Sequence, residues 1–437
     1  MNEAPPGHQL LLLSIPGRSE RDSDRLRHLA AAIDDWSRVL DDAERVGAVA
    51  LLGVALEEER ATRPPSVTEA GRADLVRGTL RTLLATRVLS EALETLRRAA
   101  IEALVLKGVP LAHELYDPPG LRPIGDIDLL VRRVDRAAAI RALFGIGYRL
   151  PAGSLPLGFY FRHHFHVTLT RPGAGGLPIE LHWDTQPRFS LSRIPSDALW
   201  ARRRPIVCDD VEIPAPAREE LFLYLAQHLL RHLIAFGPET AADPIAAMLE
   251  PARRGRLTWL ADLILLARQE PGLDWARIDR LADAWGLVRE LAGLRQYLAG
   301  LGLAPAPPGP SSMSAGAGEA TLGTIRRLAA HFPTLARASG GLQLRPILIA
   351  RLWRFAFPGP AWLRWRYSIA GDSGAARVAA RGALHATGVA GAALGMAVEL
   401  PIAWGQSRLG RLKTSRTLPE SDRNAPGTSR NCPPRIT

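Results

Sequence analysis

LKGVPLAHELYDPPGLRPIGDIDLLV, residues 106–131, is the stretch around which the rest of this chain is organised. Residues 103–106 are an apolar run that ends at Lys107-Gly108, and a helical pattern with Pro110 in its first turn follows at once. This order predicts a strand that runs into a helix through a glycine turn. Such a turn exposes backbone N–H groups beside a helix N-terminus, where a phosphate group binds. We therefore predict that Lys107 and the Gly108 turn face a phosphate.

The end of the stretch, GDIDLLV at residues 125–131, predicts a buried strand entered by two carboxylates. Because strand side chains alternate, Asp126 and Asp128 share one face, while Ile127 and Leu129 point into the core. Two aligned carboxylates repel each other unless a cation lies between them, and Mg²⁺ prefers such oxygen ligands. The pair predicts a divalent-metal site, and an aspartate-rich turn at the strand entry is the structural alternative.

A predicted β-hairpin supplies a third carboxylate. HHFHVTLT at residues 163–170 alternates, a turn-rich connector follows, and IELHWD at residues 179–184 alternates again. On the second strand Glu180 and His182 lie on the face opposite the apolar residues. If this hairpin extends the strand over 126–131 in one sheet, Glu180 joins the two aspartates. Such a carboxylate triad can hold two divalent metals for an in-line phosphoryl displacement.

The first strand of that hairpin carries further imidazoles. His164, His166 and Thr168 share one face by alternation. If this is the face of Glu180, His164 and His166 line the pocket, and a surface hairpin with incidental imidazoles is the alternative. Metal ligation by these two histidines is disfavoured because Mg²⁺ prefers oxygen ligands.

The order Lys-Gly, Arg122, DIDLLV and IELHW resembles the uncharacterised nucleotidyltransferases of the DNA polymerase β-like superfamily. The resemblance covers about residues 30–300, although no serine follows Gly108, where the superfamily usually has one. It implies an α+β fold, with a small mixed β-sheet core and N-terminal and C-terminal helical additions. It also implies catalysis by three metal ligands, Asp126, Asp128 and Glu180, with Mg²⁺ or Mn²⁺. The expected nucleotide-binding residues are Lys107, Gly108, Arg122 and His182.

The implied reaction is the transfer of a nucleoside monophosphate from an NTP, expected to be ATP, to an unidentified acceptor hydroxyl. Two alternatives stay open. One is a catalytically idle nucleotide-binding or scaffold protein that keeps the lysine and the acids as a binding site. The other is a toxin of the abortive-infection type that modifies tRNA, since Lys-Gly versions of the turn resemble those toxins.

Composition limits the class of protein. The chain has 437 residues with 47% hydrophobic content, enough to bury a sizeable core. Its net charge of +11 is concentrated at one end, because residues 321–437 hold 17 Lys and Arg against 4 Asp and Glu. The candidate catalytic region is therefore not basic, and nucleic acid is not the favoured partner. Cys208 and Cys432 are too few for a disulfide framework, which fits a reducing cytoplasm.

Hydrophobic periodicity and composition divide the chain. We expect one long helix with a single apolar face from 25 to about 61 and a second long helix over 66–100. In the second half of the chain we expect a buried Asp262 that needs a partner, either His228 or an arginine. No segment predicts a secretory signal or a membrane span, and peripheral membrane contact through 351–400 stays open.

The predicted divisions are a disordered tail (1–24), an N-terminal helical region (25–100), the α/β core (101–215), a second helical region (216–302), a linker (303–320), a basic aromatic helical region (321–405) and a disordered basic tail (406–437).

Overall fold

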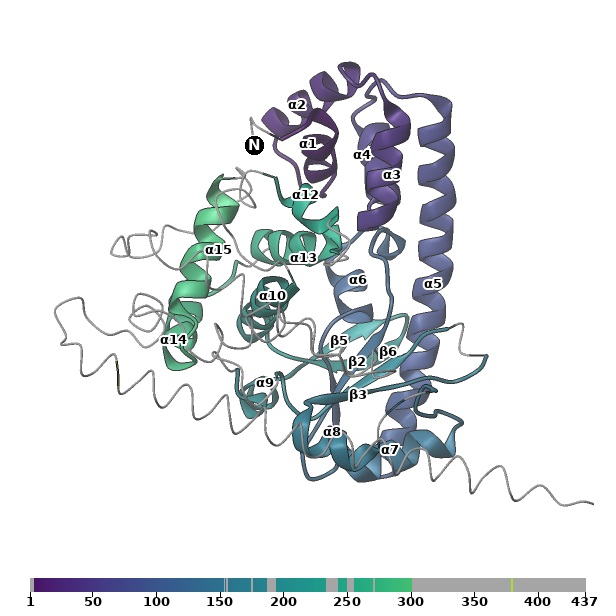
Figure 1. Cartoon of the computed structure of the whole chain (residues 1–437), viewed down its shortest axis with the longest axis vertical. Coiled ribbons are helices and arrows are strands. Elements are labelled where there is room, and N and C mark those ends of the chain that lie inside the picture. Colours follow the sequence, from purple (N-terminus) through teal and green to yellow (C-terminus); the bar gives the residue numbers. More distant parts are fainter. Residues whose placement is uncertain are drawn as a thin grey trace, which may run out of the picture.

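A computed structural model describes residues 4–152, 154, 156–173, 176–186, 194–232, 243–249, 255–269, 272–300 and 379. Apart from residue 379, the predictions made for 303–437 lie outside these residues. The described part combines a small β-sheet with helices around it, so the predicted α+β class with a small mixed sheet is confirmed (Figure 1). Within the described residues, no helix has both the length and the apolar character needed to cross a bilayer.

The main sheet has four strands in the order β1-β2-β4-β3. Its strands are β1 (Ala103–Val105), β2 (Ile127–Val131), β3 (His166–Leu169) and β4 (Ile179–His182). β2 and β4 are parallel neighbours, and the other two pairs are antiparallel. The predicted hairpin, β3 with β4, therefore does extend the DIDLLV strand, and the register sets Asp128 beside Glu180.

A second, two-stranded sheet follows in the chain, although its strands were not predicted. β5 (Arg204–Cys208) and β6 (Val211–Ala215) form an antiparallel hairpin. The turn between them uses Asp209 and Asp210, both with positive φ, a conformation that aspartate tolerates better than most residues. Prolines at 205 and 214 obscured the strand pattern in the sequence, because proline is confined to edges and bulges of sheets.

Helices surround the main sheet and form a separate layer beside it. The N-terminal helices are α1 (Pro6–Leu13), α2 (Glu20–Ala31), α3 (Trp36–Val46), α4 (Val49–Glu58) and α5 (Pro65–Arg98). The core contains α6 (Val109–Leu115), the 3₁₀ turn η1 (Pro119–Leu121), α7 (Arg136–Gly145), α8 (Leu157–His163) and α9 (Ser196–Ala201). The last helices are α10 (Arg218–His232), α12 (Pro244–Leu249), α13 (Leu257–Arg268), α14 (Trp275–Ala284) and α15 (Val288–Gly300).

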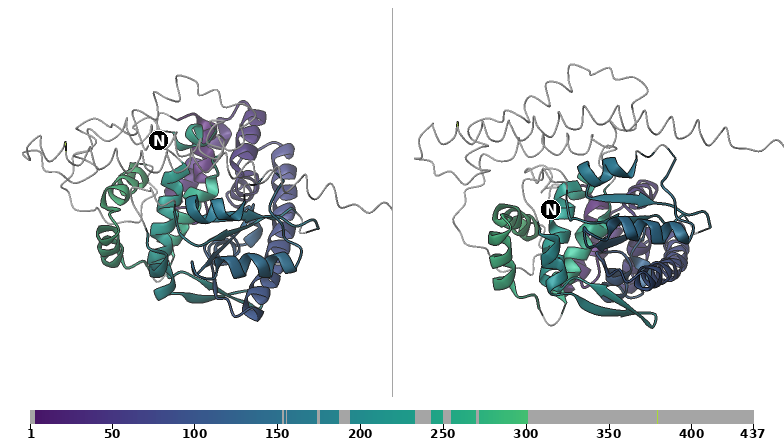
Figure 2. Two further views of the ribbon diagram at one scale, coloured as in Figure 1. Left: turned by 60° about the horizontal axis from the view of Figure 1, so that its bottom comes forward. Right: turned by 90° about the horizontal axis from the view of Figure 1, so that it is seen from below.

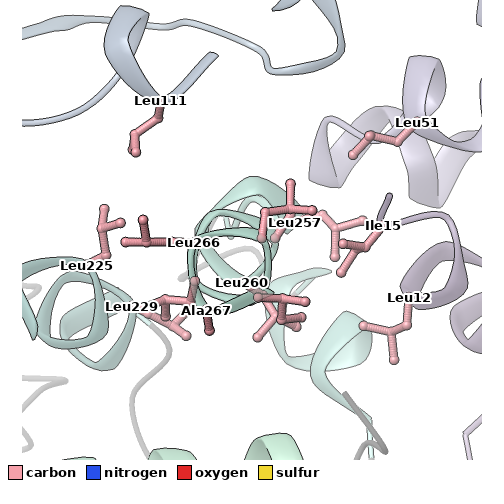
Figure 3. Close-up of a cluster of buried hydrophobic side chains, with 14 of the residues drawn as sticks. Leu12, Ile15, Leu51, Leu111, Leu225, Leu229, Leu257, Leu260, Leu266 and Ala267 are labelled. Atoms are coloured by element: carbon pink, nitrogen blue, oxygen red, sulfur yellow. The ribbon is translucent and has the colours of Figure 1, made fainter. Parts of the chain in front are cut away.

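Two clusters of buried apolar side chains hold these layers together. One joins the second half of α5 and α7 to the sheet. The other joins the N-terminal helices to α10, α13 and α14, so the regions over 25–100 and 216–302 share a core. Figure 3 shows α13 at the centre of this cluster, with neighbours contributed from distant parts of the chain, including Leu12, Ile15, Leu51, Leu111 and Leu225. The long α5 and the pair α14 and α15 lie at opposite sides of the molecule (Figures 1 and 2).

Two predictions for the N-terminal region are wrong. Residues 4–24 are not a disordered tail, because α1 is a helix whose residues Leu10–Leu13 are buried. A helix of eight residues has little stability alone, so α1 depends on the packing of its buried leucines against the rest of the protein. The segment over 25–61 is not one helix either. The Asp35 side chain caps the start of α3, and Gly47, whose backbone is in the left-handed conformation, ends that helix. The predicted helix over 66–100 is confirmed as α5.

A buried histidine fastens α1 to two other helices. His8 Nδ1 lies 2.6 Å from Asp243 Oδ2 at the start of α12, and Nε2 lies 3.3 Å from Asp42 Oδ2 of α3. Arg45 faces the same carboxylate, 3.6 Å from Asp42 Oδ1. Burial lowers the pKa of His8, but hydrogen bonds to the two aspartates and their charges outweigh it and raise the pKa above its ordinary value. The imidazolium form is thus stabilised in the folded chain.

This arrangement predicts a pH-dependent contribution to stability. Because the folded pKa of His8 is raised, the contribution is complete below about pH 6.5, the unfolded value, and is lost as the pH rises through the folded pKa. We expect His8→Gln to lower the free energy of unfolding by about 2 kcal/mol at pH 6, as expected for hydrogen bonds to charged groups. The difference from the unmodified protein should shrink steadily toward pH 9.

Urea unfolding of both proteins across pH 5.5–9 measures this difference. The control is His28→Gln, because His28 is exposed on α2 and its replacement should leave stability unchanged at every pH. A difference between His8→Gln and the unmodified protein that stays constant with pH would contradict the prediction.

Candidate functional site

Six of the seven predicted site residues lie in four segments that meet at one face of the main sheet: the turn after β1, the loop before β2, β2 itself and β4. Lys107 follows β1, Asp126 precedes β2, and Asp128 and Glu180 are register partners on β2 and β4. Parallel neighbours place partner side chains on the same face, so the carboxylates of Asp128 and Glu180 lie side by side. Gly108 adopts φ +86°, which confirms the glycine turn after Lys107.

Lys107 lies between the two aspartates. Its Nζ is 3.1 Å from Asp126 Oδ1 and also forms an ion pair with Asp128 Oδ2. Burial lowers the pKa of the ammonium, but the charges of Asp128 and Asp126 outweigh burial and raise the pKa well above its ordinary value. The lysine therefore stays charged at all physiological pH. Tyr224 of α10 also raises this pKa. The sequence carried no signal for that residue, since it lies on an otherwise ordinary amphipathic helix.

His182 joins Asp128 to Glu180. Its Nε2 lies 3.0 Å from Asp128 Oδ1 and 3.6 Å from Glu180 Oε2. Burial lowers the pKa of His182, while hydrogen bonds to the two carboxylates raise it, and the net shift is upward. Burial raises the pKa of Asp128, but the charge of Lys107 and the hydrogen bond with His182 lower it below its ordinary value. Asp128 is thus held as an ionised carboxylate inside the protein.

The side chains of the site differ in how far they are exposed to solvent. The side chains of Asp128 and His182 are 1% and 3% exposed, whereas those of Asp126 and Glu180 are 36% and 28% exposed. The buried pair and Lys107 form the base of the site. Asp126 and Glu180 are the carboxylates that an incoming molecule can reach.

The site carries more negative charge than its lysine neutralises. When a bound cation keeps all three carboxylates ionised and displaces the proton of His182, Lys107 leaves two negative charges, which one divalent cation offsets. The pKa of Asp126 is raised, first by the charge of Asp128 and then by burial. An additional cation would relieve this repulsion, so the residues fit a divalent metal.

The ligand atoms that converge most closely are not the predicted three. Among the described residues, one atom each from Asp128, Glu180 and His182 lies within 4.8 Å of the others. Asp126 is connected to this group through Lys107. The structure therefore brings His182, predicted as a nucleotide contact, into the position expected of a metal ligand.

The face of the hairpin predicted to carry imidazoles does adjoin the site. His166 is the register partner of His182, and the two rings stack with centroids 4.8 Å apart. His166 Nε2 lies 4.0 Å from Glu180 Oε2. The His164 ring meets the His166 ring edge-on, at 4.7 Å between centroids. The row of rings flanks Glu180 on the side of β3.

Arg122, predicted to contact the nucleotide, pairs with a buried carboxylate of α13. Its Nε and Nη2 donate to Asp262 Oδ1 and Oδ2 of α13, at 2.9 and 2.7 Å. The Tyr116 hydroxyl donates to the same carboxylate at 2.8 Å. The expectation that Asp262 pairs with an arginine is confirmed, whereas Arg122 is engaged as a structural partner. Its contacts give no support to triphosphate binding, and the sequence could not show this because the partner lies 140 residues away.

The comparisons with known proteins agree with this geometry. A family model described as uncharacterised nucleotidyltransferase matches residues 33–301. The matched span includes all four segments that form the site. Searches of curated proteins and of solved structures found no significant match.

Proposed function

Because the chain belongs to this family of uncharacterised nucleotidyltransferases, we propose that it transfers a nucleoside monophosphate from an NTP to an acceptor hydroxyl, with a divalent cation. The observation that carries the proposal is the pairing of Asp128 with Glu180 across parallel strands, with Lys107 beside them. Family membership supports nucleotide chemistry, and the charge of the site supports the cation. ATP is the proposed NTP.

Asp128 and Glu180 are the proposed residues that hold the cation, and Asp126 is the third. Mg²⁺ and Mn²⁺ are the proposed ions, because both accept carboxylate oxygens. When bound, such an ion offsets the negative charge that develops on the transferring phosphoryl group.

Glu180 and Lys107 are the residues proposed to act on the substrates. The acceptor oxygen forms a bond to the α-phosphorus, and the bond from that phosphorus to the bridging oxygen breaks to release pyrophosphate. Glu180, which is partly exposed, takes the proton of the attacking hydroxyl. Lys107 is permanently charged and contacts the phosphate oxygens, where it offsets the charge of the departing pyrophosphate. Asp128 keeps Lys107 in place through their ion pair.

Labelled nucleotides test the proposal. The purified chain is incubated with cell extract, Mg²⁺ or Mn²⁺, and ATP labelled at either the α- or the γ-phosphate. We expect the α label to appear on an acceptor, the γ label to appear in pyrophosphate, and both reactions to stop with a chelator. The other three NTPs, labelled in the same way, test the choice of ATP.

Other outcomes of the same experiment identify the alternatives. Transfer of the γ label would contradict nucleotidyl transfer and indicate a kinase. Nucleotide binding without pyrophosphate release would indicate an idle binding protein. Label confined to tRNA, with growth arrest on expression, would indicate a toxin acting through the same chemistry.

A further inference from the structure

His182 is placed as a metal ligand would be. On β4 it lies two residues after Glu180, so both side chains point to the same face of the sheet. Its Nε2 is 3.0 Å from Asp128 Oδ1 and 3.6 Å from Glu180 Oε2. Adjacent ligands around an octahedral ion with bonds of about 2.1 Å lie roughly 3 Å apart. The imidazole nitrogen therefore already has a ligand-like separation from Asp128 Oδ1, and Glu180 supplies a third atom within 4.8 Å of both.

The ring is also fixed in this orientation. His182 is buried, and the His166 ring stacks against it from the neighbouring strand. Phe165 adds a second ring, at 5.7 Å between centroids. A side chain locked by packing loses little conformational entropy when it binds an ion, which is how protein metal sites are preorganised.

We infer that His182 Nε2 coordinates the divalent ion directly, together with Asp128 and Glu180, and that the site prefers Mn²⁺ to Mg²⁺. This inference rests on the proposed metal-dependent function and extends it by naming the ligand set and the ion. Mg²⁺ requires hard oxygen ligands, whereas imidazole nitrogen suits first-row transition metals. An imidazole nitrogen among the carboxylate oxygens therefore raises the affinity for Mn²⁺ relative to Mg²⁺. We expect Mn²⁺ to bind at least tenfold more tightly.

A purely structural role for His182 makes a different prediction. If the imidazole only donates a hydrogen bond to Asp128, it orients that carboxylate and contributes no nitrogen to the ion. The two roles differ in whether a nitrogen nucleus lies in the coordination shell, which spectroscopy detects directly.

The test uses Mn²⁺ as the probe, without nucleotide. Pulsed electron paramagnetic resonance of Mn²⁺ bound to the full chain should show modulation from a coordinated ¹⁴N, replaced by ¹⁵N modulation when the histidines are ¹⁵N-labelled. His182→Phe should abolish the nitrogen signal. It should also weaken Mn²⁺ binding at least tenfold, since even loss of an outer-shell partner typically costs 10–100-fold. His166→Phe, which replaces the adjacent ring, is the matched control and should retain the signal.

Several results would overturn the inference. They are bound Mn²⁺ without nitrogen modulation in the unmodified chain, modulation that persists in His182→Phe, or Mg²⁺ binding as tightly as Mn²⁺. The isotope measurement needs no variant, so it stands even if His182→Phe does not fold. A nitrogen-ligated ion in a chain that transfers no nucleotide would refute the proposed function alone. Transfer with an all-oxygen site would refute this inference alone.

Discussion

Asp128→Asn is expected to lower the rate of nucleotide transfer by about 10³-fold, the upper end of what loss of one preorganised electrostatic group costs. This corresponds to roughly 4 kcal/mol in the activation free energy. The carboxylate of Asp128 has three neighbours: it contacts Lys107, it lies 3.0 Å from His182 Nε2, and it is next to Glu180 across the parallel strands. An amide of the same shape keeps the packing but supplies no charge for the cation or the lysine.

The measurement is pyrophosphate release at saturating NTP and divalent ion, with circular dichroism to confirm that the variant is folded. Asp210→Asn is the matched control, because Asp210 is an exposed turn residue with positive φ, which asparagine also tolerates. This control removes the same charge from the chain and should retain full activity. An Asp128→Asn protein that is folded and active would mean that transfer does not depend on this face of the sheet.

The sequence was sufficient for the parts of the site that depend on strand alternation. A period of two fixes which side chains of one strand share a face, so Asp126 could be grouped with Asp128, and Glu180 with His182, before any pairing was known. The glycine turn after Lys107 was equally local, since a positive φ requires glycine there. The hairpin needed one further assumption, that it joins the DIDLLV strand, and the sheet order confirms it.

Strand alternation and helical periodicity could not predict contacts between distant segments of the chain. Periodicity assigns Asp262 to a buried helix face but cannot show that Arg122 meets it, because that pairing depends on how α13 packs against the core. The N-terminal segment was mispredicted for a related reason. Its leucines resemble a short isolated run, and their burial depends on helices up to 250 residues later in the chain. Local pattern identifies a buried face, and tertiary packing determines what covers it.

Arg122→Met is expected to lower the free energy of unfolding by about 3–5 kcal/mol, because it removes one partner of a buried ion pair. Asp262 is 1% exposed and, among the described residues, would keep only the Tyr116 hydroxyl as a side-chain hydrogen-bond donor. An ionised carboxylate without a cationic partner is costly in a low-dielectric interior. Urea unfolding at pH 7 gives the free energy, and the slope of the transition checks that the same surface unfolds in both proteins.

A double-mutant cycle distinguishes the ion pair from simple loss of packing. Arg122→Met combined with Asp262→Leu removes both charges and should recover most of the stability, since an apolar pair of similar volume often replaces a buried ion pair without cost. If the double variant is as unstable as the sum of the two single ones, packing of the arginine stem, and not the unpaired charge, accounts for the loss. The stable double variant also tests whether this ion pair positions Asp126, because Arg122 lies four residues before it. If the pair holds the loop that carries Asp126, the double variant should transfer nucleotide more slowly than the unmodified protein. If the pair does not hold the loop, the two rates should be equal.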